Sequence, residues 1–133
     1  MIFDILMIGV HGILIKDKKT LMVKKGPYSI FPGGKIEVGE SDEECLVREI
    51  KEELSGTEIE VKNYYKTFYG LTPNTKVMLE SKKYFYTLKG KLGKPSAEIN
   101  GKMFVNSKNI KDLNLTEVSK KTLDSLIKDN LID

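Results

Sequence analysis

Three glutamates occur within five residues of the chain, at spacings that would place them on one face of a helix. With roughly 100° of rotation per residue, Glu49, Glu52 and Glu53 span an arc of about 100°. The apolar residues of the same stretch fall beside that arc: Leu46, Val47, Ile50 and Leu54. The carboxylates would therefore lie at the edge of the core, where like charges need a counter-charge.

Magnesium is the counter-charge that suits such a face. Mg²⁺ takes oxygen ligands and is often bound by carboxylates together with substrate phosphates. Such ions could bridge a diphosphate and generate hydroxide from bound water, and an uncoordinated carboxylate could accept the proton. Lys24, Lys25 and Lys35 are close in sequence and could receive phosphate oxygens. The pattern indicates a metal-dependent site that handles phosphate.

An acidic helix can also be a plain solvated surface, and the preceding loop helps to decide between the two interpretations. A glutamate-rich helix with an i,i+4 pair such as Glu44–Arg48 is typical of an exposed face. Here Phe31-Pro32-Gly33-Gly34 comes just before it, and two glycines allow backbone carbonyls to approach a metal closely. This combination favours the metal site.

Composition and charge exclude several classes of protein. With 133 residues and 15.1 kDa, we expect a single domain over residues 1–133. One cysteine, Cys45, excludes a disulfide framework, and with a single histidine it is too little for structural zinc. That histidine, His11, lies in an apolar run and is interpreted as a core residue. The apolar stretch at residues 1–15 is shorter than a membrane span, so we expect a cytoplasmic protein.

The elements that must position the acidic face begin with β-rich segments and one capped helix. Ser41 and Glu44 form a capping box for a helix from Ser41 to about Leu54, and Gly56 should end it. Pro27 to Gly34 should form a loop. Strand-like or extended segments are expected at residues 2–15, 20–24, 35–38, 58–69, 76–79 and 82–88.

Two further signals complete the expected fold. Asn100-Gly101 predicts a hairpin, with residues 103–105 as the returning strand. An apolar stripe at helical spacing predicts a second helix over residues 116–130. This order of strands and helices predicts an α/β fold with a mixed β-sheet and helices packed against it.

The segment from Gly34 to Glu53 resembles the Nudix box, Gly-x5-Glu-x7-Arg-Glu-U-x-Glu-Glu-x-Gly-U, in which U is a bulky aliphatic residue. Seven positions match at the required spacings: Gly34, Glu40, Arg48, Glu49, Ile50, Glu52 and Glu53. The leading Phe-Pro-Gly-Gly-Lys looks most like the MutT-type branch, and Arg48 is the only arginine of the chain. One departure is that Ser55 and Gly56 stand where the box ends in Gly-U, as if one residue were inserted.

The resemblance implies a Nudix-type α/β/α sandwich and hydrolysis of a nucleoside diphosphate linked to a group X. Water would attack phosphorus, with Mg²⁺ or Mn²⁺ as the cofactor. Glu49, Glu52 and Glu53 would be metal ligands, together with the carbonyl of Gly33. We expect Glu49 and Glu52 to be catalytic together with Arg48.

Other roles follow from the same resemblance. Glu40 would orient the acidic side chains together with the arginine. The family often adds an acidic residue from outside the box, and Glu98 is the first candidate as a further metal ligand, with Glu80 second. The residues expected to bind substrate are Lys24, Phe31, Gly34 and Lys35.

The expected substrate is a (deoxy)nucleoside triphosphate, cleaved to a monophosphate and pyrophosphate. ADP-ribose or a nucleotide sugar is the alternative, and Pro73 lies near a spacing found in some ADP-ribose hydrolases. A non-catalytic nucleotide-binding module would be expected to lack some of the box glutamates. An RNA-end hydrolase would fit the lysine excess, but we expect neither a stable nucleic-acid partner nor a membrane. The sequence leaves the oligomeric state open.

Overall fold

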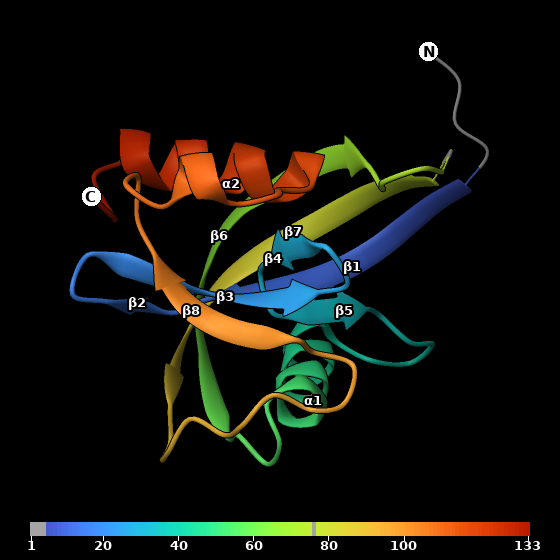
Figure 1. Cartoon of the computed structure of the whole chain (residues 1–133). Helices are drawn as coiled ribbons and strands as arrows, with labels where there is room; N and C mark the ends of the chain where they lie inside the picture. The colour runs from blue at the N-terminus through green and yellow to red at the C-terminus, as the bar shows by residue number, and fades with distance from the viewer. Residues whose placement is uncertain (1–4, 76) are drawn as a thin grey trace.

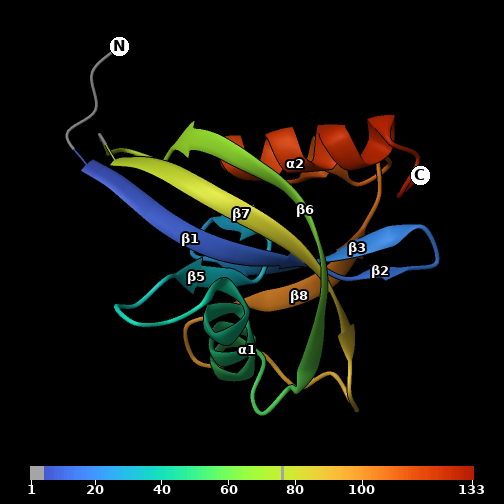
Figure 2. The same cartoon turned by 180° about the vertical axis from the view of Figure 1, so that it is seen from behind.

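The fold is built on a mixed four-stranded sheet, seen from both sides in Figures 1 and 2. The computed structural model describes residues 5–75 and 77–133. In the sheet, β1 pairs in parallel with β7 and antiparallel with β5, and β6 lies antiparallel to β7 on the far edge. These strands are β1 (Ile5–Ile13), β5 (Gly33–Lys35), β6 (Ile59–Leu71) and β7 (Val77–Leu88).

A second, smaller sheet lies against the first and is centred on β3. Its central strand pairs antiparallel with each of its neighbours. The strands are β2 (Ile15–Lys16), β3 (Lys19–Lys25), β4 (Tyr28–Ile30) and β8 (Gly101–Val105). Because β4 leads directly into β5, this sheet feeds the chain into the glycine segment that precedes the first helix.

Two helices cover opposite sides of the sheets (Figure 1). They are α1 (Asp42–Glu53) and α2 (Glu117–Lys128), and a short 3₁₀ turn, η1 (Ile110–Asp112), precedes α2. Each helix has its own apolar core: Leu46 and Ile50 belong to the one beside α1, and Leu123 and Leu126 to the one beside α2. The molecule is therefore a helix–sheet–helix sandwich. Among the described residues, no helix has the length and apolar character that crossing a membrane requires.

The first helix begins and ends where its local chemistry dictates. The Ser41 hydroxyl accepts a hydrogen bond from the Glu44 backbone N–H (3.1 Å), and the Glu44 carboxylate accepts one from the Ser41 N–H (2.9 Å). At the other end, Gly56 has a positive φ of 74° and donates its N–H to the Lys51 carbonyl (3.0 Å). This geometry fixes the start of α1 and the direction in which the chain leaves it.

The α/β sandwich, both helices and most strands are confirmed. The interpretation of residues 27–34 as a loop is wrong, because β4 and β5 form there, and the extended segment expected over 35–38 stops at Lys35. Two separate strands were expected from 76 to 88, but residues 77–88 form the single strand β7. Residues 2–4 and 76 of the expected strands lie outside the described residues.

The hairpin expected at Asn100-Gly101 is also wrong. Residues 101–105 do form a strand, β8, but it pairs with β3 from a distant part of the chain. The Asn100 N–H donates to the Lys24 carbonyl (2.7 Å), so the dipeptide starts a long-range ladder rather than closing a local turn. Local turn chemistry carries no information about a partner some eighty residues away.

We predict that Ser41→Ala lowers the free energy of unfolding by about 1 kcal/mol, because the N-terminal N–H groups of α1 lose their acceptor. Urea denaturation followed by circular dichroism would measure this loss. The matched control is Ser55→Ala, just beyond the other end of the helix, which should stay within about 0.5 kcal/mol of the parent. Equal denaturation midpoints for Ser41→Ala and the parent would contradict the capping role.

Candidate active site

Strand β5 lies beside α1 (Figure 2), and its backbone contacts carboxylates of that helix. The Gly33 N–H donates to Glu53 Oε1 at 3.0 Å. A Cβ on Gly34 would lie 2.5 Å from the carboxyl carbon of Glu49. A Cβ on Gly33, whose φ is +142°, would lie 2.2 Å from the Val10 carbonyl oxygen. Both positions therefore require glycine, one for backbone packing and the other for the close approach of a glutamate.

Arg48 ties the acidic side chains to one another. Its Nε and Nη2 bind the two oxygens of Glu40 at 2.5 and 3.0 Å, a two-point pairing that fixes both groups. Nη1 lies 3.0 Å from Glu49 and 3.5 Å from Glu52, and Nη2 also donates to the Lys35 carbonyl (3.3 Å). The guanidinium lowers the pKa of Glu40 to about 2, chiefly through these hydrogen bonds, so Glu40 stays charged.

Glu53 is the buried member of the acidic face. It is only 5% exposed, and burial is the main cause that raises its pKa to about 7. The negative charges of Glu49 and Glu98 raise the pKa further, whereas the Gly33 N–H and the charge of Lys25 lower it. Burial therefore makes a charged Glu53 energetically costly in this site.

The three glutamates of the acidic face differ in solvent exposure. Glu53 is buried, the side chain of Glu49 is 17% exposed, and that of Glu52 is 62% exposed. Within the described part of the chain, no three acidic, histidine or cysteine side chains enclose a metal position by themselves. Backbone oxygen, water and phosphate oxygen would have to complete the ligand set, as they often do for magnesium.

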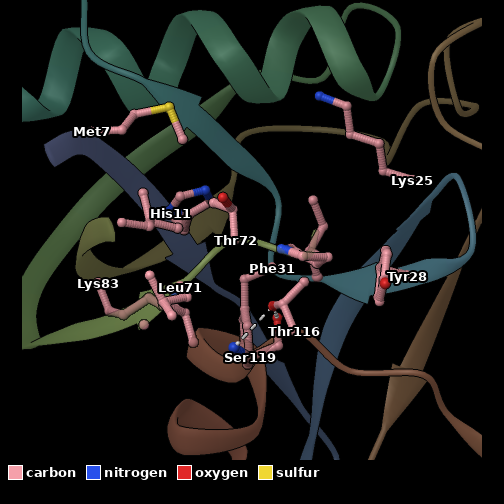
Figure 3. A pocket seen from close by; sticks show the side chains of 15 residues that line it. Met7, His11, Lys25, Tyr28, Phe31, Leu71, Thr72, Lys83, Thr116 and Ser119 are labelled. Carbon is pink, nitrogen blue, oxygen red and sulfur yellow. Dashed lines mark hydrogen bonds between the residues drawn. The ribbon is translucent and has the colours of Figure 1, made fainter. Parts of the chain in front are cut away.

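A cavity of about 270 Å³ is lined by residues of β1, β4, β7 and the start of α2, and none of the α1 glutamates lines it. In Figure 3, Met7, His11 and Lys83 lie on one side of it, Lys25 and Tyr28 on the other, with Thr116 and Ser119 below. Lys25 connects the two regions, because it lines the cavity and its charge also lowers the pKa of Glu53. A ligand in the cavity could thus extend a negatively charged group towards α1.

Two basic side chains are buried in the wall of the cavity. The Nδ1 atom of His11 lies 2.7 Å from the Ser81 hydroxyl, and its pKa is lowered by burial and by the charges of Lys83 and Lys25. Lys83 is 1% exposed, with Nζ 4.6 Å from the centre of the Phe31 ring, and burial lowers its pKa to about 7. The burial of His11 agrees with its interpretation as a core residue, whereas the sequence analysis did not identify Lys83.

The remaining residues expected to bind substrate have different surroundings. Phe31 is fully buried and lines the cavity. Lys24 is exposed and lines a second cavity with Gly101 and Asn114 on the other side of β3. Lys35 is exposed, and its backbone carbonyl binds Arg48. Of the three nearby lysines, Lys25 is the one that lines the cavity and also lowers the pKa of Glu53 through its charge.

The two acids expected from outside the box also differ. Glu98 is exposed on the segment before β8, close enough for its charge to raise the pKa of Glu53. Glu80 lies on β7 and accepts a hydrogen bond from the Tyr69 hydroxyl (2.9 Å). The electrostatic coupling favours Glu98 over Glu80 as the further member of the site.

Comparison with known proteins gives one family match and several similar structures. The model of the NUDIX domain matches residues 6–126. An ADP-ribose pyrophosphatase of Methanocaldococcus jannaschii is 48% identical over 52 residues, which are 35% of this chain and 30% of that protein. The matched part therefore spans about a third of that relative's length.

Solved structures share the fold at low sequence identity. A MutT protein from Methanosarcina mazei superposes with a TM-score of 0.75 at 18% identity, covering 98% of this chain and 99% of that one. A UDP-X diphosphatase superposes with a TM-score of 0.74 at 20% identity, covering 98% of this chain and 64% of that one. These similarities establish the architecture of the molecule.

The first prediction from the site concerns pH in the absence of divalent cations. Because the pKa of Glu53 is raised from 4.5 to about 7 on folding, the folded chain binds its proton more tightly than the unfolded chain. The contribution of Glu53 to stability is therefore lost as the pH rises through this window. As the pH rises from 4.5 to 8, the free energy of unfolding of Glu53→Gln should increase by roughly 1–3 kcal/mol relative to that of the parent.

Urea denaturation in EDTA at several pH values would measure this difference. Glu58→Gln, at an exposed glutamate just after α1, is the control and should follow the parent at every pH. If the free energies of unfolding of Glu53→Gln and the parent changed in parallel with pH, the pKa of Glu53 would not be raised by folding.

The second prediction concerns the space beside Gly34. In Gly34→Ala, the new methyl group should displace the flexible Glu49 carboxylate while the fold is kept. The affinity for Mn²⁺, measured by calorimetry or electron paramagnetic resonance, should then fall about 10- to 100-fold. Gly90→Ala, where a Cβ meets open space, should bind Mn²⁺ like the parent. Unchanged affinity in Gly34→Ala would exclude Glu49 as a ligand.

Proposed function

Since the NUDIX domain model matches residues 6–126, this chain belongs to the Nudix hydrolase family, and we propose that it hydrolyses the diphosphate linkage of a nucleotide with the help of a divalent cation. The observation that carries the proposal is the contact between the α1 glutamates and the glycine backbone of β5. It holds the carboxylates against the main chain of β5. A cavity large enough for part of a nucleotide lies nearby and contains Lys25, whose charge affects Glu53.

The donor set fits Mg²⁺ or Mn²⁺. Glu49, Glu52 and Glu53 would hold the cation together with the Gly33 carbonyl, and Glu98 is the further candidate. The raised pKa of Glu53 supports this assignment, because a buried carboxylate that is costly to charge alone gains most from a bound cation. When bound, the cation neutralises phosphate charge and lowers the pKa of water.

The chain's own residues would position and assist this chemistry. The Glu40–Arg48 pair holds the guanidinium against Glu49 and Glu52, so both carboxylates are restrained before substrate binds. One of these two carboxylates would accept the proton of the attacking water. The placement of Glu52 at the solvent edge allows water to reach it. Arg48 acts through the glutamates it orients.

The cavity would hold the nucleoside, with its phosphates directed past Lys25 towards α1. A volume of about 270 Å³ is at the small end for ligand sites, and suits one ring system better than two nucleoside-like groups. This favours a (deoxy)nucleoside triphosphate, cleaved to a monophosphate and pyrophosphate. Lys24, Lys35, Phe31 and Gly34 stay in the proposed binding region, with Lys25 now the best placed for phosphate.

A nucleoside diphosphate sugar or ADP-ribose is the second candidate substrate. It is favoured by the 48% identity over 52 residues to a protein named ADP-ribose pyrophosphatase. In that case the group beyond the diphosphate would extend from α1 into solvent rather than into the cavity. Both candidates need the same acidic face, so they differ in products rather than in catalytic residues.

We predict that Glu52→Gln lowers kcat at least 100-fold, because the amide can neither accept a proton nor bind a cation as a carboxylate does. The assay would incubate the protein and Mg²⁺ with nucleoside triphosphates, ADP-ribose and UDP-sugars, and measure pyrophosphate, phosphate and monophosphate. Circular dichroism should show an unchanged fold. Glu43→Gln, an exposed glutamate in the first turn of the same helix, is the matched control and should keep parental activity. Full activity in Glu52→Gln would refute the assignment of the acidic face.

A further inference from the structure

Lys83 is a buried lysine that the proposed chemistry does not use. It lies on β7, is 1% exposed, and borders the cavity beside α2. In the described part of the chain, no oxygen accepts a hydrogen bond from its Nζ and no carboxylate pairs with it; the contact found is with the face of Phe31, 4.6 Å from the ring centre. A buried lysine is normally paired, so this one needs an explanation.

Apart from the half-buried Tyr28 and the exposed Lys25, the other polar side chains in the cavity wall already have partners. His11 is bonded to Ser81, and the Thr72 hydroxyl donates to the Val77 carbonyl (3.2 Å). The Thr116 hydroxyl donates to the Ser119 hydroxyl at 2.8 Å and accepts from the Ser119 N–H at 3.3 Å, and hydrogen bonding between these two residues is dashed in Figure 3. Lys25 is exposed and can be solvated. Lys83 is therefore the buried donor in this wall that is left for a ligand.

The rest of the wall is suited to a flat, apolar ring. The aromatic residues Tyr28 and Phe31 and a set of aliphatic side chains contribute most of the surface, including Met7, Ile30, Leu71, Leu79 and Val118. Aromatic and aliphatic walls favour a planar ring, whereas a single buried donor fixes its orientation. A nucleobase has both properties, since its faces are apolar and its edges carry acceptors and donors.

The chemistry of the lysine determines which base edge it accepts. A carbonyl oxygen accepts a hydrogen bond from Lys83 whether the side chain is charged or neutral. An exocyclic amino group in the same position would face the ammonium donor to donor, so it could bind only after the lysine loses its proton, whereas a carbonyl binds either form. A site built around one buried donor rejects a ligand that lacks the matching acceptor more strongly than an apolar site rejects an extra atom.

We propose that Lys83 is a specificity-determining residue that selects nucleotides whose base presents a carbonyl oxygen to the cavity over those that present an amino group there. The inference rests on the proposed function, because it assigns the base end of the same substrate. It identifies the substrate class by its base: keto bases such as uracil, thymine, guanine or hypoxanthine, rather than adenine or cytosine.

The test uses two matched pairs of triphosphates, UTP against CTP and ITP against ATP. The members of each pair differ by a keto or amino group and by the protonation of the adjacent ring nitrogen. For the parent, kcat/KM should be at least about tenfold higher for the keto member of one or both pairs. In Lys83→Met, which keeps the length and apolar stem of the side chain, that ratio should fall towards one, mainly because the keto substrate reacts more slowly. Lys62→Met, at an exposed lysine on β6 that pairs with Glu60, should keep the parental ratio.

The outcomes separate this inference from the proposed function. If the parent hydrolyses none of the nucleotides or nucleotide conjugates tested, the proposed function fails. If it hydrolyses them without a keto preference, or if Lys83→Met keeps the preference, the inference alone is overturned. If Lys83→Met slows all four triphosphates equally, the ammonium binds phosphate and the inference is likewise wrong. Should the variant fail to fold, calorimetric comparison of UMP with CMP binding to the parent still decides, and equal affinities would overturn the inference.

Discussion

The structure depends on the close approach of the β5 backbone to the carboxylates of α1. Two consecutive glycines make this approach sterically allowed, and the Gly33 N–H stabilises the carboxylate that burial makes costly to charge. Arg48 supplies the opposite charge that holds Glu40 and Glu49 in place beside it. The capping box and the core behind Leu46 and Ile50 matter to function because they keep the helix at this distance.

Much of the fold was predictable because its signals are local. Capping residues, helical spacing of apolar side chains and runs of β-branched and aromatic residues identified both helices and the long strands. The main errors in the predicted fold concern which strands pair with one another. Residues 33–35 form a strand because β1 is available beside them, and β8 forms against β3 rather than across a hairpin at Asn100-Gly101. Proline, glycine and turn dipeptides indicate the local conformation of the backbone. They do not indicate which distant strand a segment will pair with.

The acidic face of the site could be predicted because, as for the helix itself, its signals are local in the sequence. Glu49, Glu52 and Glu53 share one helix, so their spacing alone fixes their relative directions. The cavity could not be predicted this way, because His11, Lys25 and Lys83 come from three different strands. Strand β7 is covered on both faces, so alternation did not mark Lys83 as inward-facing among the polar residues around it. A basic residue within the strand expected over residues 82–88 was the available signal.

The parallel pairing of β1 with β7 has a consequence for how the protein is made. Residues 5–13 can find their partner only after residues 77–85 have left the ribosome, and the helix that closes the cavity is formed by residues 117–128. Contacts between residues far apart in sequence slow folding, because the entropic cost of closing a large loop comes before the contacts can stabilise the chain. During synthesis β5 can pair early with one edge of β1, but the other edge, which pairs with β7, stays open for longer. We therefore expect the nascent chain to depend on chaperone protection until nearly all of it has emerged.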